Sequence, residues 1–248
     1  GEFGRMKRLL PRLQAIYDHI AITFRVGADD ESQIVQWMTD HNILLDTFEG
    51  WSGRHLVVKK ALEANTGFIQ YADLDRLVRW GELNPDELRE TAQRIQQQDM
   101  LIIGRTESAW ATHPRSLFET ERVFNDVFSH HFGRTLDFGA GSRCLSRRAA
   151  EFIVRHATEQ QALAMDAGWA VLLRRGGFTW DFVEVDGLDW ETADQYRDAA
   201  ADSETQHRAA EAYDLKPENW QLRVQVAQGI IQHGLMAMKR ELDTTKEK

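Results

Sequence analysis

Two aspartates, Asp73 and Asp75, directly follow a short apolar run, residues 68–72, that opens after Gly67. The run predicts a strand, and side chains two residues apart on a strand point to the same face. The two carboxylates can therefore point together at the strand's carboxyl end, where open α/β sheets bind ligands. Such oxygen pairs suit Mg²⁺ or Mn²⁺, which usually share their coordination with substrate phosphates. An alternative is that Asp75 caps a helix beginning at Arg76.

Further short segments surround this pair in a definite order. Upstream, the segments are a strand-like run at residues 19–26, an acidic turn at residues 27–32, Gly53-Arg54, Ala61, Ala64 and Gly67. Downstream, the segments are a glycine-rich run at residues 137–143, Ser146-Arg147-Arg148, Asp166-Ala167-Gly168-Trp169, Arg175-Gly176-Gly177 and a strand-like run at residues 183–185.

This order resembles that of the GT-A nucleotide-sugar glycosyltransferases, particularly the family 2-like branch, over residues 12–190. The resemblance implies a GT-A-like mixed sheet flanked by helices, and metal-dependent transfer of a sugar from a nucleoside-diphosphate sugar to an acceptor hydroxyl. It implies Asp73 and Asp75 as ligands of Mg²⁺ or Mn²⁺, and Asp166 as the catalytic base. The implied nucleotide-sugar ligands are Asp29, Gly53, Arg54, Asp73, Gly141 and Arg143.

The sequence departs from the family pattern near its start. Family members begin with a strand that contacts the nucleotide base, but residues 9–17 already have the apolar spacing of the following helix. The family's first strand therefore has no counterpart in the sequence. Residues 1–5 resemble an expression scar before Met6, which leaves either a natural start at Met6 or an omitted upstream segment. Arg25 stands where the family has an acidic residue.

Composition narrows the classes of protein further. With 248 residues, the chain can bury one substantial core, and its net charge of −9 argues against nonspecific nucleic-acid binding. The single cysteine, Cys144, excludes an intrachain disulfide framework. Apolar runs fall short of the ~20 residues that a membrane helix needs. We expect a cytoplasmic protein without a transmembrane segment.

Strand-like and helix-like runs alternate, which predicts an α/β fold. Residues 100–104 predict a buried strand, and Asn84-Pro85 predicts the start of a helix that continues through Gln98. We expect one domain at residues 6–191 and a helical extension at residues 192–248, with Leu222, Val226, Ile230 and Met236 facing inward. Homo-oligomer formation through this extension stays open. Residues 105–115 are long enough for a lid, and the favoured interpretation of His113 within them is a surface histidine.

The run Gly139-Ala140-Gly141-Ser142 supports two interpretations. It can present backbone N–H groups to an anion at the start of the helix that contains residues 146–156, or it can be a plain turn between a strand and a helix. It lacks the lysine and hydroxyl residue of a P-loop and the spacing of a dinucleotide fingerprint.

Two other functions remain alternatives to glycosyl transfer. One is a GT-A-like protein without transferase activity that serves as a ligand-binding or interaction module, which the missing first strand favours. The other is a phosphohydrolase with Asp73 as nucleophile and Asp75 as acid or base. The phosphohydrolase is disfavoured because the expected Thr or Val does not follow Asp75.

Overall fold

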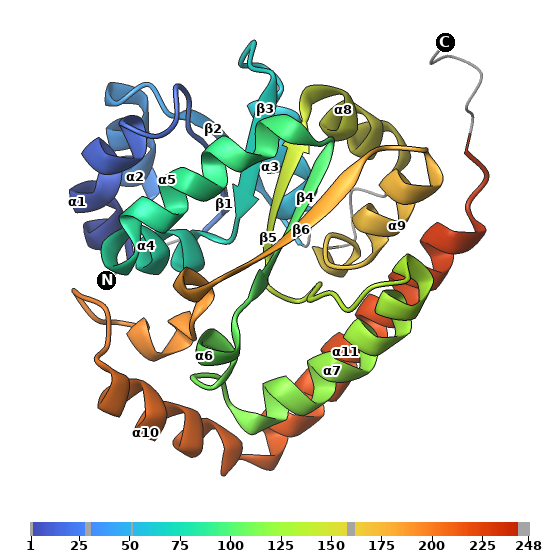
Figure 1. The fold of residues 1–248 in the computed structure, drawn as a ribbon. Helices are drawn as coiled ribbons and strands as arrows, with labels where there is room; N and C mark the ends of the chain where they lie inside the picture. Colours follow the sequence, from blue (N-terminus) through green and yellow to red (C-terminus); the bar gives the residue numbers. More distant parts are fainter. Residues whose placement is uncertain (1, 28–30, 51, 158–161, 243–248) are drawn as a thin grey trace.

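The computed structural model describes residues 2–27, 31–50, 52–157 and 162–242, which form a mixed α/β fold with two sheets (Figure 1). Asp29, a predicted nucleotide-sugar ligand, lies outside the described residues. The strands are β1 (Ala21–Arg25), β2 (Leu44–Phe48), β3 (Phe68–Ala72), β4 (Met100–Arg105), β5 (Ser142–Ser146) and β6 (Trp180–Val185). The predicted α/β class is confirmed.

Helices connect the strands and form both ends of the described chain. The α-helices are α1 (Glu2–Gln14), α2 (Glu31–Asp40), α3 (Gly53–Ala61), α4 (Leu74–Leu83), α5 (Pro85–Arg94), α6 (Glu107–Trp110), α7 (Arg115–Phe132), α8 (Arg147–His156), α9 (Gly168–Arg175), α10 (Ser203–Asp214) and α11 (Pro217–Lys239). Short 3₁₀ turns are η1 (Ile95–Gln97), η2 (Ala162–Ala164), η3 (Asp186–Leu188) and η4 (Glu191–Asp194).

The two sheets differ in topology. In the smaller sheet, β1 and β2 are parallel, with Ala21 opposite Leu44. In the larger sheet the strand order is β3-β5-β4-β6, with β5 antiparallel to both of its neighbours and β6 parallel to β4. Because β3 and β4 are both antiparallel to β5, the carboxyl ends of β3, β4 and β6 meet at one edge of the sheet. That edge carries Asp73.

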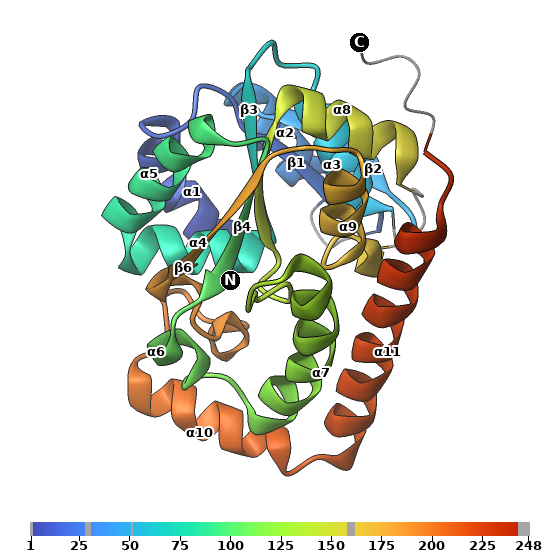
Figure 2. The same cartoon turned by 45° about the vertical axis from the view of Figure 1, so that its right-hand side comes forward.

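Helices cover both faces of the larger sheet. Met100 and Ile102 on β4 belong to the core cluster beneath α7, α8 and α9, whereas Leu101 and Ile103 belong to the cluster beneath α1, α4 and α5. Figure 2 shows α8 and α9 on the opposite side of the sheet from α4 and α5. A strand buried on both faces needs a continuous apolar run, and this run is what predicted β4 from the sequence.

The C-terminal helix α11 packs along α7 and α9 and so belongs to the main core (Figure 2). Its close approach depends on small residues, since a Cβ on Gly234 would lie 2.0 Å from the ring of Phe128. Ile230 faces inward as predicted, but Leu222 and Met236 are 50% and 48% exposed, so their predicted burial is wrong. The buried face of α11 is formed mainly by small residues, which are Ala227, Gly234 and Ala237. The prediction placed the large apolar residues on that face.

The N-terminal helix α1 begins earlier than the sequence predicted. Arg5 is buried and its guanidinium binds the carboxylates of Glu82 and Asp194, each with an N–O distance of 2.8 Å. Residues 2–5 are therefore part of the folded protein, and their origin as an expression scar stays a prediction.

The segment at residues 105–115 is folded in this structure, and its predicted role as a lid stays a prediction. It contains α6, and Trp110 stacks on the Arg105 guanidinium at 3.5 Å from the ring centre. His113 is buried, not on the surface, and its Nδ1 lies 2.9 Å from the Ala109 carbonyl oxygen. Charged side chains from distant segments, Arg76 and Arg223, also lie near this histidine, and its local sequence gave no sign of them.

Candidate functional site

Asp73 lies at the carboxyl end of β3, in the position before the first residue of α4. Its carboxylate does not cap that helix. One oxygen instead accepts a hydrogen bond of 2.5 Å from the Tyr71 hydroxyl, and the other accepts one of 2.7 Å from Arg54. Because α4 begins at Leu74, the alternative in which Asp75 caps a helix from Arg76 is wrong.

Arg54 joins Asp73 to Asp166, which lies 93 residues further along the chain. Arg54 is the second residue of α3, and its other terminal nitrogen lies 3.3 Å from an Asp166 oxygen. Asp166 is buried just before α9. The structure therefore brings these two predicted site residues together in one charge cluster. Their predicted roles as metal ligand and base remain predictions.

The two carboxyl groups differ in their electrostatics. Burial raises the pKa of Asp73, but Arg54, Arg76 and the Tyr71 hydroxyl outweigh burial, so the net pKa lies below the ordinary value. Burial also raises the pKa of Asp166, and there the nearby Arg54 and Arg143 do not reverse the effect. Asp73 is thus held as a carboxylate, whereas Asp166 is more ready to take a proton.

Asp75 lies in the first turn of α4, near a second acidic residue, Glu191 of η4. Burial raises the pKa of Asp75 to about 7, with further contributions from Glu191 and Asp73. Arg76 interacts with the charges of Glu191, Asp73 and Asp75, and its Nε lies 3.5 Å from a Glu191 oxygen. Tyr71, Arg76 and Glu191 were not predicted as site residues. For Glu191, the sequence offers no signal, because its distance from Asp75 is set by the tertiary fold.

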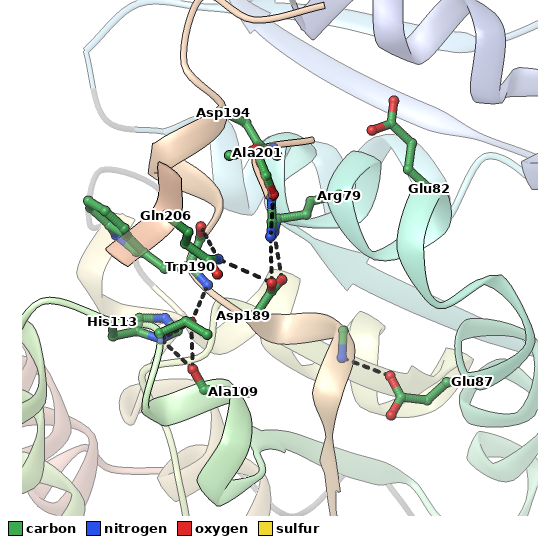
Figure 3. Close-up of polar contacts among 12 residues, drawn as sticks. Arg79, Glu82, Glu87, Ala109, His113, Asp189, Trp190, Asp194, Ala201 and Gln206 are labelled. Atoms are coloured by element: carbon green, nitrogen blue, oxygen red, sulfur yellow. Dashed lines mark hydrogen bonds and ion pairs between the residues drawn. The ribbon is translucent and has the colours of Figure 1, made fainter. Parts of the chain in front are cut away.

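Glu191 is held in place by the segments on either side of it. Arg79 on α4 binds Asp189 at 2.6 Å and Asp194 at 2.7 Å, so it fastens both ends of the short stretch that carries Glu191. Gln206 on α10 adds a hydrogen bond of 3.1 Å to Asp189. Figure 3 shows Arg79 pointing toward Asp189 and Asp194, with Gln206 on the other side of Asp189.

We expect Asp75→Asn to stabilise the protein at high pH. A carboxyl whose folded pKa is raised binds more protons in the folded state, so stability falls as pH rises from the unfolded value near 4 to about 7. The asparagine variant lacks this loss. Urea unfolding should give a gain of roughly 2 kcal/mol at pH 8 and almost none at pH 4, after allowance for solvent screening.

Asp86→Asn provides the matched control for this pH dependence, because Asp86 is an exposed residue in the first turn of α5. Because it removes only an exposed carboxyl and a surface ion pair, it should change the free energy of unfolding by less than about 1 kcal/mol at either pH. If the free energy of unfolding depended on pH in the same way in wild type and Asp75→Asn, the raised pKa would not belong to Asp75.

The glycine-rich run forms a wall of the site but does not lie at a helix start. Ser142 begins β5, which separates the run from α8, so both interpretations of the run, an anion site at a helix start and a turn between a strand and a helix, are wrong. Gly141 has a φ of +61°, and a Cβ there would lie 2.8 Å from an Asp73 oxygen. The close approach to Asp73 therefore requires glycine at this position.

Arg143, a predicted nucleotide-sugar ligand, points into the protein. Its side chain is 1% exposed and donates hydrogen bonds to the carbonyl oxygens of Ser142, Phe138 and Asp166. Burial lowers its pKa to about 10. These contacts fix the backbone beside Asp166, so Arg143 positions the site and does not face a ligand.

A cavity of about 550 Å³ opens beside the charge cluster. Its polar lining includes Arg25, Arg54 and Asp73, and Gly53 at the start of α3. Gly53 packs against the ring of Phe48, and its carbonyl oxygen accepts a hydrogen bond of 3.0 Å from Thr23. The cavity is thus bounded by β1, α3 and the end of β3, and it combines guanidinium groups with the amino end of a helix, both of which favour anions.

The predicted metal site does not match the arrangement of these side chains. Both Asp73 oxygens already accept hydrogen bonds, and the Asp75 carboxylate accepts one from the Arg76 backbone N–H at 2.9 Å. Within the described residues, no group of three or more His, Cys, Asp or Glu side chains is placed to hold a metal ion.

Comparison with known proteins gives no matching family model, no matching curated protein and no matching solved structure. The helices of the described residues include none long and apolar enough to cross a membrane.

Proposed function

We propose that this protein is a GT-A-like glycosyltransferase that binds a nucleoside-diphosphate sugar beside Asp73 and transfers the sugar to an acceptor hydroxyl. The observation that carries the proposal is the convergence of Arg54, Asp73 and Asp166, from three separate parts of the chain, at one open edge of the sheet. Ligand sites of α/β sheets form at this edge. The resemblance of the sequence order to the GT-A glycosyltransferases supports Asp73 on the donor side and Asp166 as the base.

Arg54 is the group best placed to bind the diphosphate. Its side chain is 26% exposed, lines the cavity and is held by two carboxylates. As the bond from sugar to diphosphate breaks, negative charge grows on the leaving group, and a fixed guanidinium stabilises that charge. Arg25, which also lines the cavity, adds a second cation at the same mouth.

Asp166 supplies the complementary function of proton acceptance. Transfer to a hydroxyl requires a base for its proton, and a carboxyl with a raised pKa is better matched to this task near neutral pH. Arg54 links this carboxyl to the donor side, so donor binding and the base are coupled through one side chain.

The central test is binding of uridine or guanosine diphosphate by calorimetry. We expect Arg54→Met to weaken binding at least about tenfold, because charged phosphate contacts contribute on the order of 1.5–3 kcal/mol. Arg122→Met, which changes an exposed arginine on α7, should leave binding unchanged. Equal affinities for wild type and Arg54→Met would reject the site.

The same titration tests the predicted metal. If Asp73 and Asp75 bind Mg²⁺ or Mn²⁺, nucleotide binding should be lost in a chelator and in Asp75→Ala. The arrangement of arginines around Asp73 favours the opposite result, in which binding persists in the chelator. The result decides whether arginine or a metal ion supplies most of the positive charge that balances the diphosphate.

A non-catalytic ligand-binding module is the second candidate. It is favoured by the separation of β1 and β2 from the larger sheet, which leaves the donor cavity bounded by two unjoined sheets. The two functions differ in one measurement. A module binds nucleoside diphosphates but releases none from any nucleotide sugar, with or without an added acceptor.

A further inference from the structure

The segment at residues 106–114 runs from the end of β4 to the start of α7 and contains the single-turn helix α6. Its helix packs mainly against η3 and the end of β4. The flanking residues Thr106 and Pro114 are both extended, with ψ of 167° and 144°. A short segment with little packing of its own, held at its ends by a buried strand and a long helix, can move as one unit. We call it the α6 segment.

Polar contacts with η3 and with the residue before η4 hold the α6 segment in place. The hydroxyls of Thr106 and Ser108 both donate hydrogen bonds to the Asp186 carboxylate. The Thr112 hydroxyl accepts a hydrogen bond of 2.9 Å from the Trp190 backbone N–H. The two bonds to Asp186 are exposed, so water competes for the same groups and their net contribution is small.

Several buried polar atoms in and beneath the α6 segment are left without hydrogen bonds. Among the described residues, no partner is present for Arg105 Nη1, His113 Nε2, Trp190 Nε1 or the Oε2 oxygen of Glu191. All four residues are less than a tenth exposed. Each of these atoms gives up its bonds to water when the segment is closed, which destabilises the closed arrangement relative to an opened one.

The groups beneath the α6 segment belong to one charge cluster that adjoins Asp75. The charges of Arg105 and Arg76 both act on His113. The Nε of Arg76 lies 3.5 Å from a Glu191 oxygen, and the charge of Glu191 acts in turn on Asp75. Opening of the α6 segment therefore exposes this cluster to solvent.

His113 is neutral while the α6 segment is closed. Its Nδ1 lies 2.9 Å from the Ala109 carbonyl oxygen, which can only accept, so Nδ1 carries the proton and Nε2 does not (Figure 3). The charged groups that act on the ring are Arg105 from β4, Arg76 from α4 and Arg223 from α11. Burial and these three cations hold the pKa of His113 well below its usual range.

We propose that the α6 segment is a lid that opens and closes over this cluster, and that acid favours the open lid through protonation of His113. In the open lid the imidazole is hydrated and is half-protonated near its ordinary value of about pH 6.5. The closed lid binds no proton at this ring. Its stability relative to the open lid is therefore complete above about pH 7.5 and falls as the pH drops through about 6.5.

Thiol labelling of Ala109→Cys tests the lid on the full chain, without nucleotide. Ala109 is 2% exposed on α6, so a thiol there reacts with dithiodipyridine when the segment opens. The natural Cys144, 0% exposed in the larger sheet, reports opening of the whole fold in the same molecule. At pH 8 the introduced thiol should react at least about 100-fold faster than Cys144, because local opening needs less free energy than global unfolding. Equal rates would overturn the lid.

Ala170→Cys provides the matched control, because it makes the same change at a 0% exposed position on α9. Its introduced thiol should react as slowly as Cys144. If it reacted as fast as the thiol of Ala109→Cys, the reactivity would come from the substitution and the lid would be rejected. Any loss of global stability in Ala109→Cys speeds Cys144 as well, so the ratio of the two rates decides the test in either case.

The pH dependence of the same reaction tests His113. Rates are divided by those of an unstructured cysteine peptide at the same pH, which removes the ionisation of the thiol itself. Lid opening should be about tenfold more frequent at pH 5.5 than at pH 8. His113→Asn, whose amide keeps a donor for the Ala109 carbonyl, should abolish this rise, whereas His207→Asn at an exposed position on α10 should keep it. A rise that persists in His113→Asn, or no rise in the protein with His113, would overturn the role of His113.

Discussion

Asp166→Asn is expected to reduce sugar transfer by about 10²- to 10⁴-fold while nucleotide binding changes little. Asparagine keeps the size of the side chain but cannot accept the acceptor's proton. Arg54 keeps its bond to Asp73 in the variant, so the donor site retains its main cation. Release of nucleoside diphosphate from a panel of nucleotide sugars, in the presence of candidate acceptors, measures the transfer.

Asp126→Asn is the control for this substitution, because it makes the same chemical change at an exposed position on α7. It should retain full activity. Unchanged turnover in Asp166→Asn would remove Asp166 from catalysis. Undiminished nucleotide binding together with no turnover in the wild type would favour the non-catalytic module.

Arg79→Met is expected to lower the free energy of unfolding by about 3–5 kcal/mol. Arg79 is 2% exposed, and its loss removes the cation that Asp189 and Asp194 share in the interior, although Asp194 keeps its ion pair with Arg5 (Figure 3). Methionine fills part of the volume but offers no donor. The stretch between Asp189 and Asp194 carries Glu191, whose negative charge helps to raise the pKa of Asp75. Because Arg79→Met no longer holds this stretch in place, the pKa of Asp75 should fall in the same variant.

Arg89→Met provides the comparison, since Arg89 pairs with Asp86 on the exposed face of α5. Surface pairs of this kind contribute about 0–1 kcal/mol. Urea unfolding of both variants measures the difference. Similar small losses in both would show that the buried Arg79 network contributes little to stability.

The sequence alone determined the elements whose burial pattern is simple. The apolar run of β3, the buried run of β4 and the proline start of α5 were all predicted near their observed positions. In contrast, β5 was missed because Ser142-Arg143-Cys144-Leu145-Ser146 has no apolar run. It is a strand because β3 and β4 bond to it from both sides, which only the assembled sheet decides.

The candidate site divides in the same way. The spacing of the acidic residues after β3 is visible in the sequence, and it predicted Asp73 and Asp75 as candidate ligand-binding residues. Only the tertiary structure placed Arg54 between Asp73 and Asp166, turned Arg143 inward and brought Glu191 close to Asp75. Periodicity reports which face of an element is buried, but which distant charges share a low-dielectric site depends on packing across the whole sheet.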